Sequence, residues 1–379
     1  MRVLIDYRPA LRERTGVGEY THELVKALAR AIDTETLDLT VFSSSWRDRL
    51  RLDEPGLGGV RAIDRRVPVR LLNLAWHRLG WPTAEGLAGR TFDVTHSPHP
   101  LLLPTRAAAQ VITIHDLSFL ENADPSRPDV RRDYAALVHT HASRADRIIV
   151  SSQYAAGEIE RRLGVPGQKI ALCPPGAPDW PARTAPPASG YVLFVGTLEP
   201  RKNVGALLDA YERLLSHEHA TSHDALPELV LAGKATPASR AWLERIARPP
   251  LRGVVRHLGY VDAGHRRALY EGARLLVLPS FEEGFGLPVL EAMTIGVPVV
   301  AARRGALPEV LGQAGPLIDP DNPANLAAAI ERLLGDSAFA ADCASKGLAR
   351  SRAFRWDTTA ERVVDVYRAA IEHRRCASA

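Results

Sequence analysis

The chain has 379 residues, a length that predicts two domains rather than one. With 46% hydrophobic and 24% charged residues, the composition excludes a disordered or fibrous protein, and no apolar run is long enough to cross a bilayer. The formal charge of +4 suits an anionic partner without selecting among a nucleotide, a nucleic acid and an anionic lipid. Three cysteines without metal-ligand spacing argue against a disulfide framework, and the first residues resemble a strand rather than a signal peptide. We therefore expect a cytoplasmic protein.

The first half of the chain alternates short β-branched runs with helical patterns. Ser152 stands where an N-cap would begin one of the predicted helices. Strands are predicted at 2–7, 37–44, 92–97, 110–117 and 146–152. This alternation predicts an α/β domain, with helices covering a parallel sheet.

Residues Pro174–Gly190 contain six prolines among seventeen residues, which predicts a linker at 179–189. It separates a first domain, 1–178, from a second α/β domain, 190–354, in which strands and helices alternate again. The segment 355–379 is predicted to be a long amphipathic helix that packs away from the second domain. Two such sheets would face a central cleft, with ligands beyond the carboxyl ends of the strands.

The stretch "SFEEGFGLPVLEAMTIGVPVV" predicts a helix over 287–295, because Pro288 suits a first turn and Gly296 suits a stop. Free amides at its N-terminus would favour an anion such as a pyrophosphate, and they belong to Gly284, Phe285, Gly286 and Leu287. Glu283 would accept hydrogen bonds from sugar hydroxyls and Glu291 would bind a ribose. The alternative is that Glu283 is solvated and Glu291 only stabilises the start of the helix.

A second candidate loop, "GTLEPRKN", follows the apolar strand "YVLFV" and begins with Gly196 and Thr197. Arg201 and Lys202 would clamp diphosphate oxygens from this position, Arg201 through two parallel hydrogen bonds. As an isolated pair, they are more often surface charges. Their place after a core strand favours the ligand-binding alternative.

In the first half, Gly16 and Gly18 form a loop between the first strand and the first helix, where backbone can approach a ligand. His115 follows an apolar strand and is expected at the edge of the cleft. It would either hydrogen-bond substrate or be a satisfied structural histidine. The same two alternatives hold for His96.

The motifs "GVGEY", "ITIHDLSF", "VSSQYA", "FVGTLEPRKN", "HLGYV", "LVLPSFEEGFGLPVLEAMTIGVPVVA" and "ALPEVLGQAGPLIDPDN" occur in the order found in retaining glycosyltransferases of family 4. The chain resembles that family over nearly its whole length, and Glu283 and Glu291 match its E-x7-E motif. The resemblance implies a GT-B fold made of two Rossmann-like domains. It also implies a nucleotide-sugar donor on the second domain, an acceptor on the first, and a last helix that crosses back to the first. The bacterial polysaccharide and O-antigen mannosyltransferases are the most similar subgroup, which implies GDP-mannose as donor.

The resemblance also implies roles for individual residues. Arg201 and Lys202 would bind the donor phosphates, Glu283 the transferred sugar and Glu291 the ribose. His115 would contact the sugar near the reaction centre, and Gly16 would line the phosphate side of the cleft. Cations at the leaving phosphate stabilise the transition state, and the departing phosphate itself would take the acceptor's proton. Because no DxD-like acidic pair follows a strand, we predict activity without a metal or other cofactor.

Arginines, leucines and two tryptophans are concentrated between Arg61 and Trp81. This segment either contacts the inner leaflet of the membrane peripherally or forms an ordinary amphipathic helix with solvated arginines. No tract resembles an RNA-binding motif, so we expect no nucleic-acid partner. The alternative functions are a transferase that uses a UDP- or ADP-sugar, a nucleotide-sugar epimerase or phosphorylase, and a binding protein without catalysis.

Overall fold

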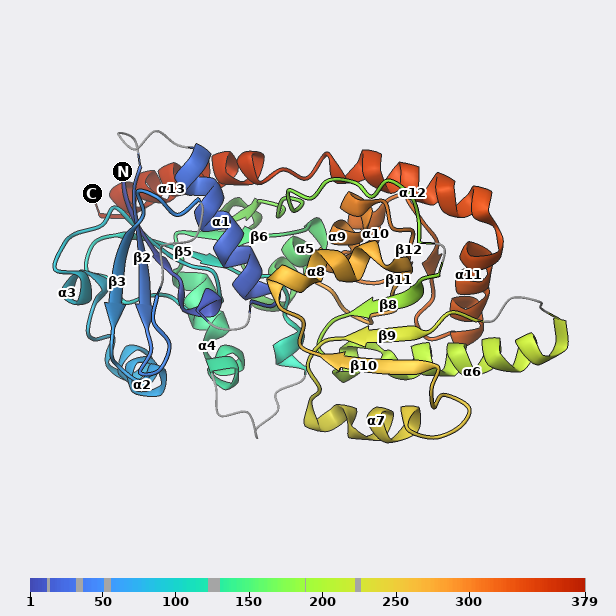
Figure 1. The fold of residues 1–379 in the computed structure, drawn as a ribbon. Coiled ribbons are helices and arrows are strands. Elements are labelled where there is room, and N and C mark those ends of the chain that lie inside the picture. The colour runs from blue at the N-terminus through green and yellow to red at the C-terminus, as the bar shows by residue number, and fades with distance from the viewer. Residues whose placement is uncertain are drawn as a thin grey trace. The chain divides into compact units, whose positions relative to one another are not determined.

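A computed structural model describes residues 1–11, 14–31, 37–50, 56–121, 130–187, 189–221 and 226–378. The chain divides into two compact units, each with its own parallel sheet covered by helices (Figure 1). The first unit comprises Met1–Gly176 and Arg355–Ala379, and the second comprises Ala177–Phe354. The predicted α/β fold class is confirmed by these two sheets.

The first unit contains a seven-stranded sheet in which every strand pair is parallel. β1 lies in its interior between β2 and β4, so the chain reverses its direction of travel across the sheet at β1 and β4. In spatial order the strands are β3 (Arg61–Arg65), β2 (Asp38–Ser44), β1 (Arg2–Asp6), β4 (Val94–Ser97), β5 (Ala109–Thr113), β6 (Arg147–Val150) and β7 (Ile170–Leu172).

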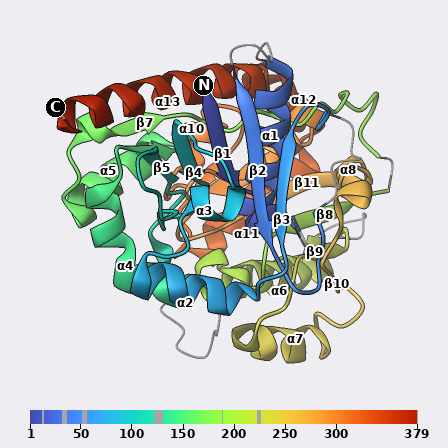
Figure 2. The same cartoon turned by 90° about the vertical axis from the view of Figure 1, so that its left-hand side faces the viewer.

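Successive residues of β1 enter different cores, as the two-residue period of a strand requires. Val3 and Ile5 pack in a cluster with α1 (Val17–Ala31) and α13 (Trp356–Ser378). Leu4 packs with α2 (Val69–Leu79) and α3 (Ala84–Ala88) in a separate cluster. Figure 2 shows α13 along the top of the view and α2 along the bottom. The remaining helices of the unit are η1 (Arg8–Ala10), η2 (Ser118–Leu120), α4 (Val130–Arg144), α5 (Gln153–Leu163) and η3 (Gly167–Lys169). Helices therefore bury both faces of the sheet.

Local signals in the sequence explain where several helices begin. The side chain of Ser152 accepts a hydrogen bond from the amide of Ala155, which confirms the predicted N-cap of α5. In the second unit, α9 (Leu287–Ile295) has Pro288 in its first turn and ends at Gly296 in the left-handed conformation. Its predicted bounds are confirmed, because proline and glycine act at fixed positions of a helix.

The second unit contains a six-stranded sheet, again with only parallel pairs. Its strands lie in the order β10 (Val255–Gly259), β9 (Leu229–Ala232), β8 (Tyr191–Val195), β11 (Ala273–Leu278), β12 (Val299–Ala302) and β13 (Leu317–Ile318). Its other helices are η4 (Pro200–Lys202), α6 (Val204–Thr221), η5 (Pro237–Ser239), α7 (Arg240–Ile246), α8 (Ala263–Glu271), α10 (Leu307–Leu311), α11 (Pro323–Gly335) and α12 (Ser337–Ser351). This strand order is that of the Rossmann fold.

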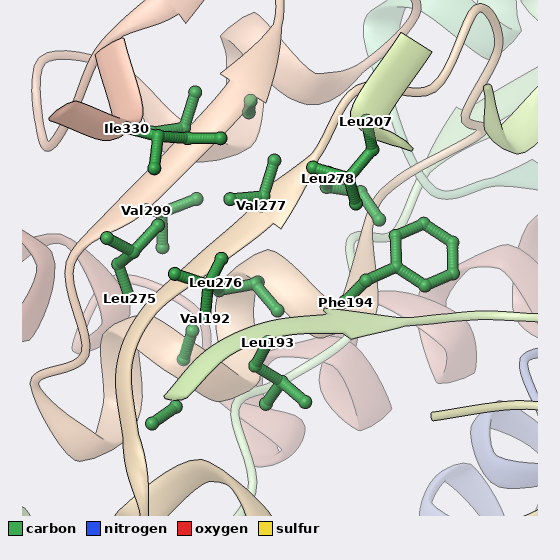
Figure 3. Packing of buried hydrophobic residues seen from close by; sticks show 14 of the residues in the cluster. Val192, Leu193, Phe194, Leu207, Leu275, Leu276, Val277, Leu278, Val299 and Ile330 are labelled. Carbon is green, nitrogen blue, oxygen red and sulfur yellow. The ribbon is translucent and has the colours of Figure 1, made fainter. Parts of the chain in front are cut away.

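The core of the second unit is centred on β8 and β11. Leu276 and Val277 of β11 are fully buried, with Leu193 of β8 and Val299 of β12 among their cluster (Figure 3). Burying each such side chain stabilises the fold by about 1.5–3 kcal/mol. Because helices cover both faces, these strands are continuous apolar runs rather than alternating ones. This rigid core fixes the loops that follow β8 and β11.

The proline-rich stretch predicted as a linker packs along the second unit. The amide of Ala177 donates to the carbonyl of Phe354 at 2.9 Å, and Arg183 donates through Nη1 to the carbonyl of Ala273 at 2.6 Å. Proline-rich backbone has few amides to satisfy, so a few contacts of this kind hold it. Among the described residues, no helix has the length and apolar character needed to cross a bilayer.

Candidate functional site

Two of the predicted ligand loops meet in the second unit. β8 and β11 are neighbours at the point where the strand order reverses, so the loops that follow them lie at the same edge of the sheet. The amide of Phe281 donates to the carbonyl of Arg201 at 2.8 Å, and Arg201 Nη1 donates to the carbonyl of Glu282 at 3.1 Å. The loops are therefore held together directly, although about eighty residues separate them in the sequence.

The two cations of the first loop are paired with carboxylates. Lys202 Nζ forms an ion pair with Glu283, and Arg201 Nη1 lies 3.6 Å from Glu283 Oε2. Arg201 Nε also forms an ion pair with Glu199 at 2.7 Å. Ser280 completes the group by donating its hydroxyl to Glu283 Oε1 at 2.8 Å. Glu283 is therefore not solvated, which was the alternative for this residue, but is 6% exposed and bound on several sides.

Electrostatics keeps Glu283 ionised. Burial raises the pKa of its carboxyl group, but the charges of Lys202 and Arg201 and the hydrogen bonds from Lys202 and Ser280 outweigh burial, so the pKa lies below its ordinary value. Burial also lowers the pKa of Lys202, against the opposing effect of Glu283. The arrangement is a buried carboxylate that orients two cations.

Gly305, which follows β12, supports the backbone of Glu283. Its φ is +59°, and a Cβ atom at this position would lie 2.7 Å from the carbonyl oxygen of Glu283. That same carbonyl accepts a hydrogen bond from the amide of Ala306 at 2.9 Å. Sequence reasoning missed Gly305, although "RRGALP" after an apolar strand carries the signal of a glycine turn.

The N-terminus of α9 follows Glu283 in the chain and presents backbone amides. Gly286 is its N-cap, with φ +100°. Within the described part of the chain, the amides of Phe285, Gly286 and Leu287 form no backbone hydrogen bond. Gly284 is buried in the turn before them. The ring of Phe285 packs edge-on against Phe354, with 5.7 Å between ring centroids, so only its amide is available to a ligand.

Gly196 and Thr197 are held by the neighbouring strand β9. The amide of Gly196 donates to the carbonyl of Ala232 at 2.9 Å. Gly233, which sequence reasoning missed, lies so close that a Cβ atom there would be 1.9 Å from the carbonyl oxygen of Gly196. Any side chain at Gly233 would therefore displace the start of the Arg201 loop.

Glu291 lies on α9 and contacts α8. Its Oε2 accepts a hydrogen bond from the hydroxyl of Tyr270 at 2.6 Å, and its Oε1 lies 3.2 Å from Arg266 Nε. Arg266 in turn lies over the ring of Trp180, 5.8 Å from its centroid. Tyr270, Arg266 and Trp180 were all missed, because their contact with Glu291 is not visible in any local sequence pattern.

The predicted residues of the first unit lie near the start of α1 and the end of β5. The His115 ring packs edge-on against Tyr20, with 4.6 Å between ring centroids. Its Nε2 has no hydrogen-bond partner among the described residues. Burial is the main cause that lowers the pKa of His115 to about 4, so its ring is neutral at pH 7.

Gly16 and Gly18 have different surroundings. Only Gly16 lies in the predicted loop, because α1 begins at Val17 and Gly18 is therefore its second residue. Gly16 has a φ of +42° and no atom within 4 Å of a built Cβ. A Cβ atom at Gly18 would lie 2.6 Å from the carbonyl oxygen of Pro9, so Gly18 permits close packing of α1 on η1. His96 is a satisfied structural histidine, the second of the two alternatives for this residue. Its two ring nitrogens form hydrogen bonds with the hydroxyls of Tyr367 at 2.7 Å and Thr113 at 2.8 Å.

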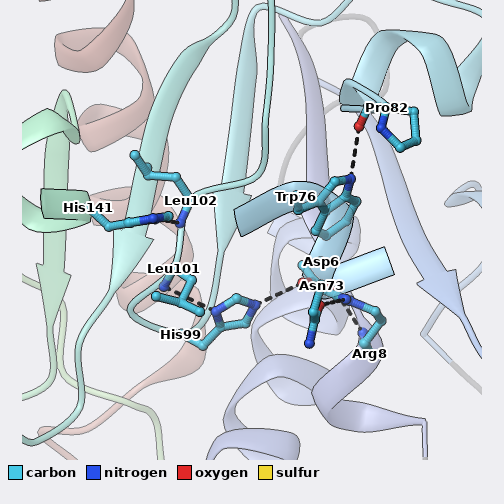
Figure 4. Close-up of polar contacts among 9 residues, drawn as sticks. All are labelled: Asp6, Arg8, Asn73, Trp76, Pro82, His99, Leu101, Leu102 and His141. Atoms are coloured by element: carbon cyan, nitrogen blue, oxygen red, sulfur yellow. Dashed lines mark hydrogen bonds and ion pairs between the residues drawn. The ribbon is translucent and has the colours of Figure 1, made fainter. Parts of the chain in front are cut away.

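A buried polar network at the ends of β1 and β4 was not predicted (Figure 4). Arg8 Nη2 and Asp6 Oδ2 are 2.5 Å apart, and His99 Nε2 donates to the same oxygen at 2.9 Å. Arg8 Nη1 also donates to Asn73 at 2.8 Å, and its guanidinium lies 4.6 Å from the centre of the Trp76 ring. This network occupies the point where the strand order of the first unit reverses.

Two Rossmann-type units in one chain, with Arg201 and Lys202 after β8 and Glu283 after β11 of the second, are the arrangement expected of a GT-B glycosyltransferase. The family model "Glycosyltransferase Family 4" matches residues 14–179, and "Glycosyl transferases group 1" matches residues 189–336. The O-antigen chain mannosyltransferase B of Escherichia coli is 32% identical over 97% of this chain and 100% of that protein. The chain belongs to glycosyltransferase family 4.

Solved structures agree on the fold. Sucrose-phosphate synthase from Thermosynechococcus elongatus has a TM-score of 0.77 at 21% identity, covering 97% of this chain and 98% of that one. WaaG, a glycosyltransferase involved in lipopolysaccharide biosynthesis, has a TM-score of 0.70 at 15% identity, covering 97% and 99%. At these identities the likeness supports the GT-B fold alone.

Proposed function

We propose that the protein is a retaining mannosyltransferase that takes mannose from GDP-mannose without a metal. The observation that carries this proposal is the cluster of Arg201, Lys202 and Glu283 beside the N-terminus of α9, where free amides and two oriented cations face the same sheet edge. The proposed sugar follows the relative that is named a mannosyltransferase and is similar over its whole length.

The chemistry follows from the charges of this cluster. Cleavage of the anomeric C–O bond leaves negative charge on the β-phosphate, which Arg201, Lys202 and the α9 amides would stabilise more in the transition state than in the ground state. The departing phosphate oxygen would take the proton of the acceptor hydroxyl on the same face of the sugar. Because Lys202 and Ser280 already bind Glu283, its role is to orient the cations and accept sugar hydroxyls, not to attack the sugar.

The proposed acceptor is a glycan or lipid-linked glycan used for cell-surface polysaccharide. A lipid-linked acceptor suits action at the cytoplasmic face of a membrane through the expected contact at Arg61–Trp81. A UDP- or ADP-sugar donor and a nucleotide-sugar epimerase are the competing functions. Incubation with donor alone distinguishes an epimerase from a transferase, since an epimerase converts the donor without an acceptor.

The proposal is tested by thermal unfolding with GDP, UDP and ADP at equal concentration. A nucleotide at a hundred times its Kd stabilises the protein by about 2.7 kcal/mol, so GDP is expected to raise the melting temperature most. NMR of the glycoside product then reports whether the anomeric configuration is retained. Selective stabilisation by UDP, or an inverted product, would overturn the corresponding part of the proposal.

Replacing Glu291 with glutamine is expected to weaken nucleotide binding about tenfold, because a charged acceptor for the ribose hydroxyls is lost while the bond from Tyr270 can persist. Isothermal titration with GDP measures the change. Glu331→Gln, on the exposed side of α11, is the control and should bind like wild type. An unchanged Kd together with lower stability would instead show that Glu291 only holds Tyr270 and Arg266 in place.

The transfer rate should not depend on ionisation of His115. With a pKa of about 4, its ring stays neutral from about pH 5 to about pH 9. Its other ring nitrogen is hydrogen-bonded to the backbone of Pro98, which leaves Nε2 to accept a hydrogen bond. His115→Gln, which keeps an acceptor, is expected to retain more activity than His115→Phe. This expectation would be contradicted if the wild-type rate fell as the pH was lowered through about 6.5 while the rate of His115→Gln did not.

A further inference from the structure

Large exposed hydrophobic side chains are concentrated in one part of the first unit. Among the described residues, seven such side chains are exposed, and five of them lie between residues 46 and 81, whereas Leu258 and Phe281 belong to the second unit. The five are Trp46 (71% exposed), Leu71 (60%), Leu74 (58%), Leu79 (74%) and Trp81 (66%). Single exposed hydrophobics are ordinary, but a group of this size marks an interaction surface.

Helix α2 is apolar on two opposite faces. Leu72 and Trp76 point into the core of the first unit, and Trp76 Nε1 also donates to the carbonyl of Pro82 at 2.8 Å. At about 100° per residue, Leu71 and Leu74 fall on the opposite side, with Arg78 one turn further along the same stripe. The inner face already secures the helix, and the outer leucines, which are mostly exposed, add little packing to the fold.

Trp46 belongs to the same surface although it lies after another strand. The hydroxyl of Ser44 donates to the carbonyl of Val67 at 2.7 Å, and the amide of Ser45 donates to the carbonyl of Arg65 at 3.1 Å. These two bonds tie the segment that carries Trp46 to the segment that enters α2. Arg47 follows Trp46 and is also exposed.

The charged side chains between residues 65 and 84 are all positive. From Arg65 to Ala84 the sequence contains four arginines and no aspartate or glutamate. Arg66, Arg70 and Arg78 are exposed, and none forms an ion pair with a described residue. These three arginines therefore present positive charge that no described carboxylate neutralises, which favours a negatively charged partner.

We infer that Trp46, the outer face of α2 and Trp81 form one surface that binds an anionic lipid bilayer. Tryptophan rings favour the level of the lipid headgroups, leucines enter the acyl boundary, and arginines attract anionic headgroups. A partner with an apolar surface alone would not account for the excess of positive charge. The inference rests on the membrane contact proposed for Arg61–Trp81, names the side chains that would make it, and does not depend on the identity of the donor.

Vesicle co-sedimentation without nucleotide tests the surface. The wild-type chain should bind phosphatidylcholine vesicles that contain phosphatidylglycerol, bind pure phosphatidylcholine weakly, and dissociate as salt rises above roughly 0.1 M. The double variant Leu71→Ser/Leu74→Ser should bind at least about tenfold more weakly. Leu258→Ser, an exposed leucine of the second unit, is the matched control and should bind like wild type.

Both variants should melt at the wild-type temperature, because the substituted side chains are exposed, and both should still bind GDP in the thermal assay if that donor is correct. Absence of wild-type binding to phosphatidylglycerol vesicles at low salt would overturn the inference. So would equal binding by the double variant. If wild type instead self-associates and the double variant does not, the surface is an interface between two copies of the chain.

Discussion

Replacing Arg201 with alanine is expected to lower the rate of sugar transfer by about 100- to 1,000-fold, the effect of removing one preorganised donor to a developing negative charge. The side chain is 22% exposed, and without it Glu283 keeps the ion pair with Lys202 and the hydrogen bond from Ser280. No buried charge then loses all of its partners, so the loss of stability should stay at about 1–3 kcal/mol. Steady-state kinetics should place the loss in kcat more than in KM, since the charge develops in the transition state.

Two further variants sharpen this experiment. Arg201→Lys keeps the charge but not the planar pair of donors, so its rate should lie between those of wild type and Arg201→Ala. Arg256→Ala removes an arginine that pairs with Glu228 on the exposed side of the same unit, and should transfer sugar at the wild-type rate. Near-normal transfer by Arg201→Ala would exclude Arg201 from the phosphate clamp.

Replacing Asp6 with alanine is expected to destabilise the first unit by about 3 kcal/mol. The carboxylate is fully buried and receives both Arg8 and His99, so its removal leaves the Arg8 guanidinium buried without a counter-charge. Urea unfolding measures the loss. The double variant Asp6→Ala/Arg8→Met should recover part of it, because both charges are then removed together.

The same variant has a defined pH dependence. Burial raises the pKa of Asp6, but Arg8 and His99 lower it more, so the folded pKa lies well below the ordinary value of 3.8. A depressed pKa gives stability that is complete above the unfolded pKa and is lost as pH falls toward the folded one. The difference between wild type and Asp6→Ala should therefore be full at pH 7 and shrink below about pH 4. Asp365→Ala, which breaks an exposed pair with Arg368, should change stability little. If Asp365→Ala lost as much stability as Asp6→Ala, burial of the ion pair would not explain the effect.

Features that depend on short-range signals could be predicted from the sequence. The bounds of α9 follow from Pro288 and Gly296, and the parallel sheets follow from apolar runs that alternate with helical patterns. The positions of the Arg201 and Glu283 loops at one sheet edge also follow, because both come after parallel strands of one sheet.

Features that depend on long-range contacts could not be predicted in this way. From the sequence, Arg201 and Lys202 were predicted to bind phosphate, with no carboxylate partner. In the structure both pair with Glu283, some eighty residues away. Tyr270 beside Glu291 and Gly233 beside Gly196 were missed for the same reason. The network of Asp6 and His99 joins segments 93 residues apart, and only the strand order β1–β4 brings them together.

The pairing of the two cations has a consequence for what the proposed donor site rejects. Glu199 and Glu283 act as internal counter-ions that occupy Arg201 and Lys202 before any ligand arrives. An incoming phosphate must compete with them, and a small anion offers nothing beyond its charge to do so. A nucleotide sugar also brings a base, a ribose and a hexose, each with contacts of its own. The built-in carboxylates would thus make the site selective against the abundant inorganic phosphate of the cell, while still admitting the larger donor.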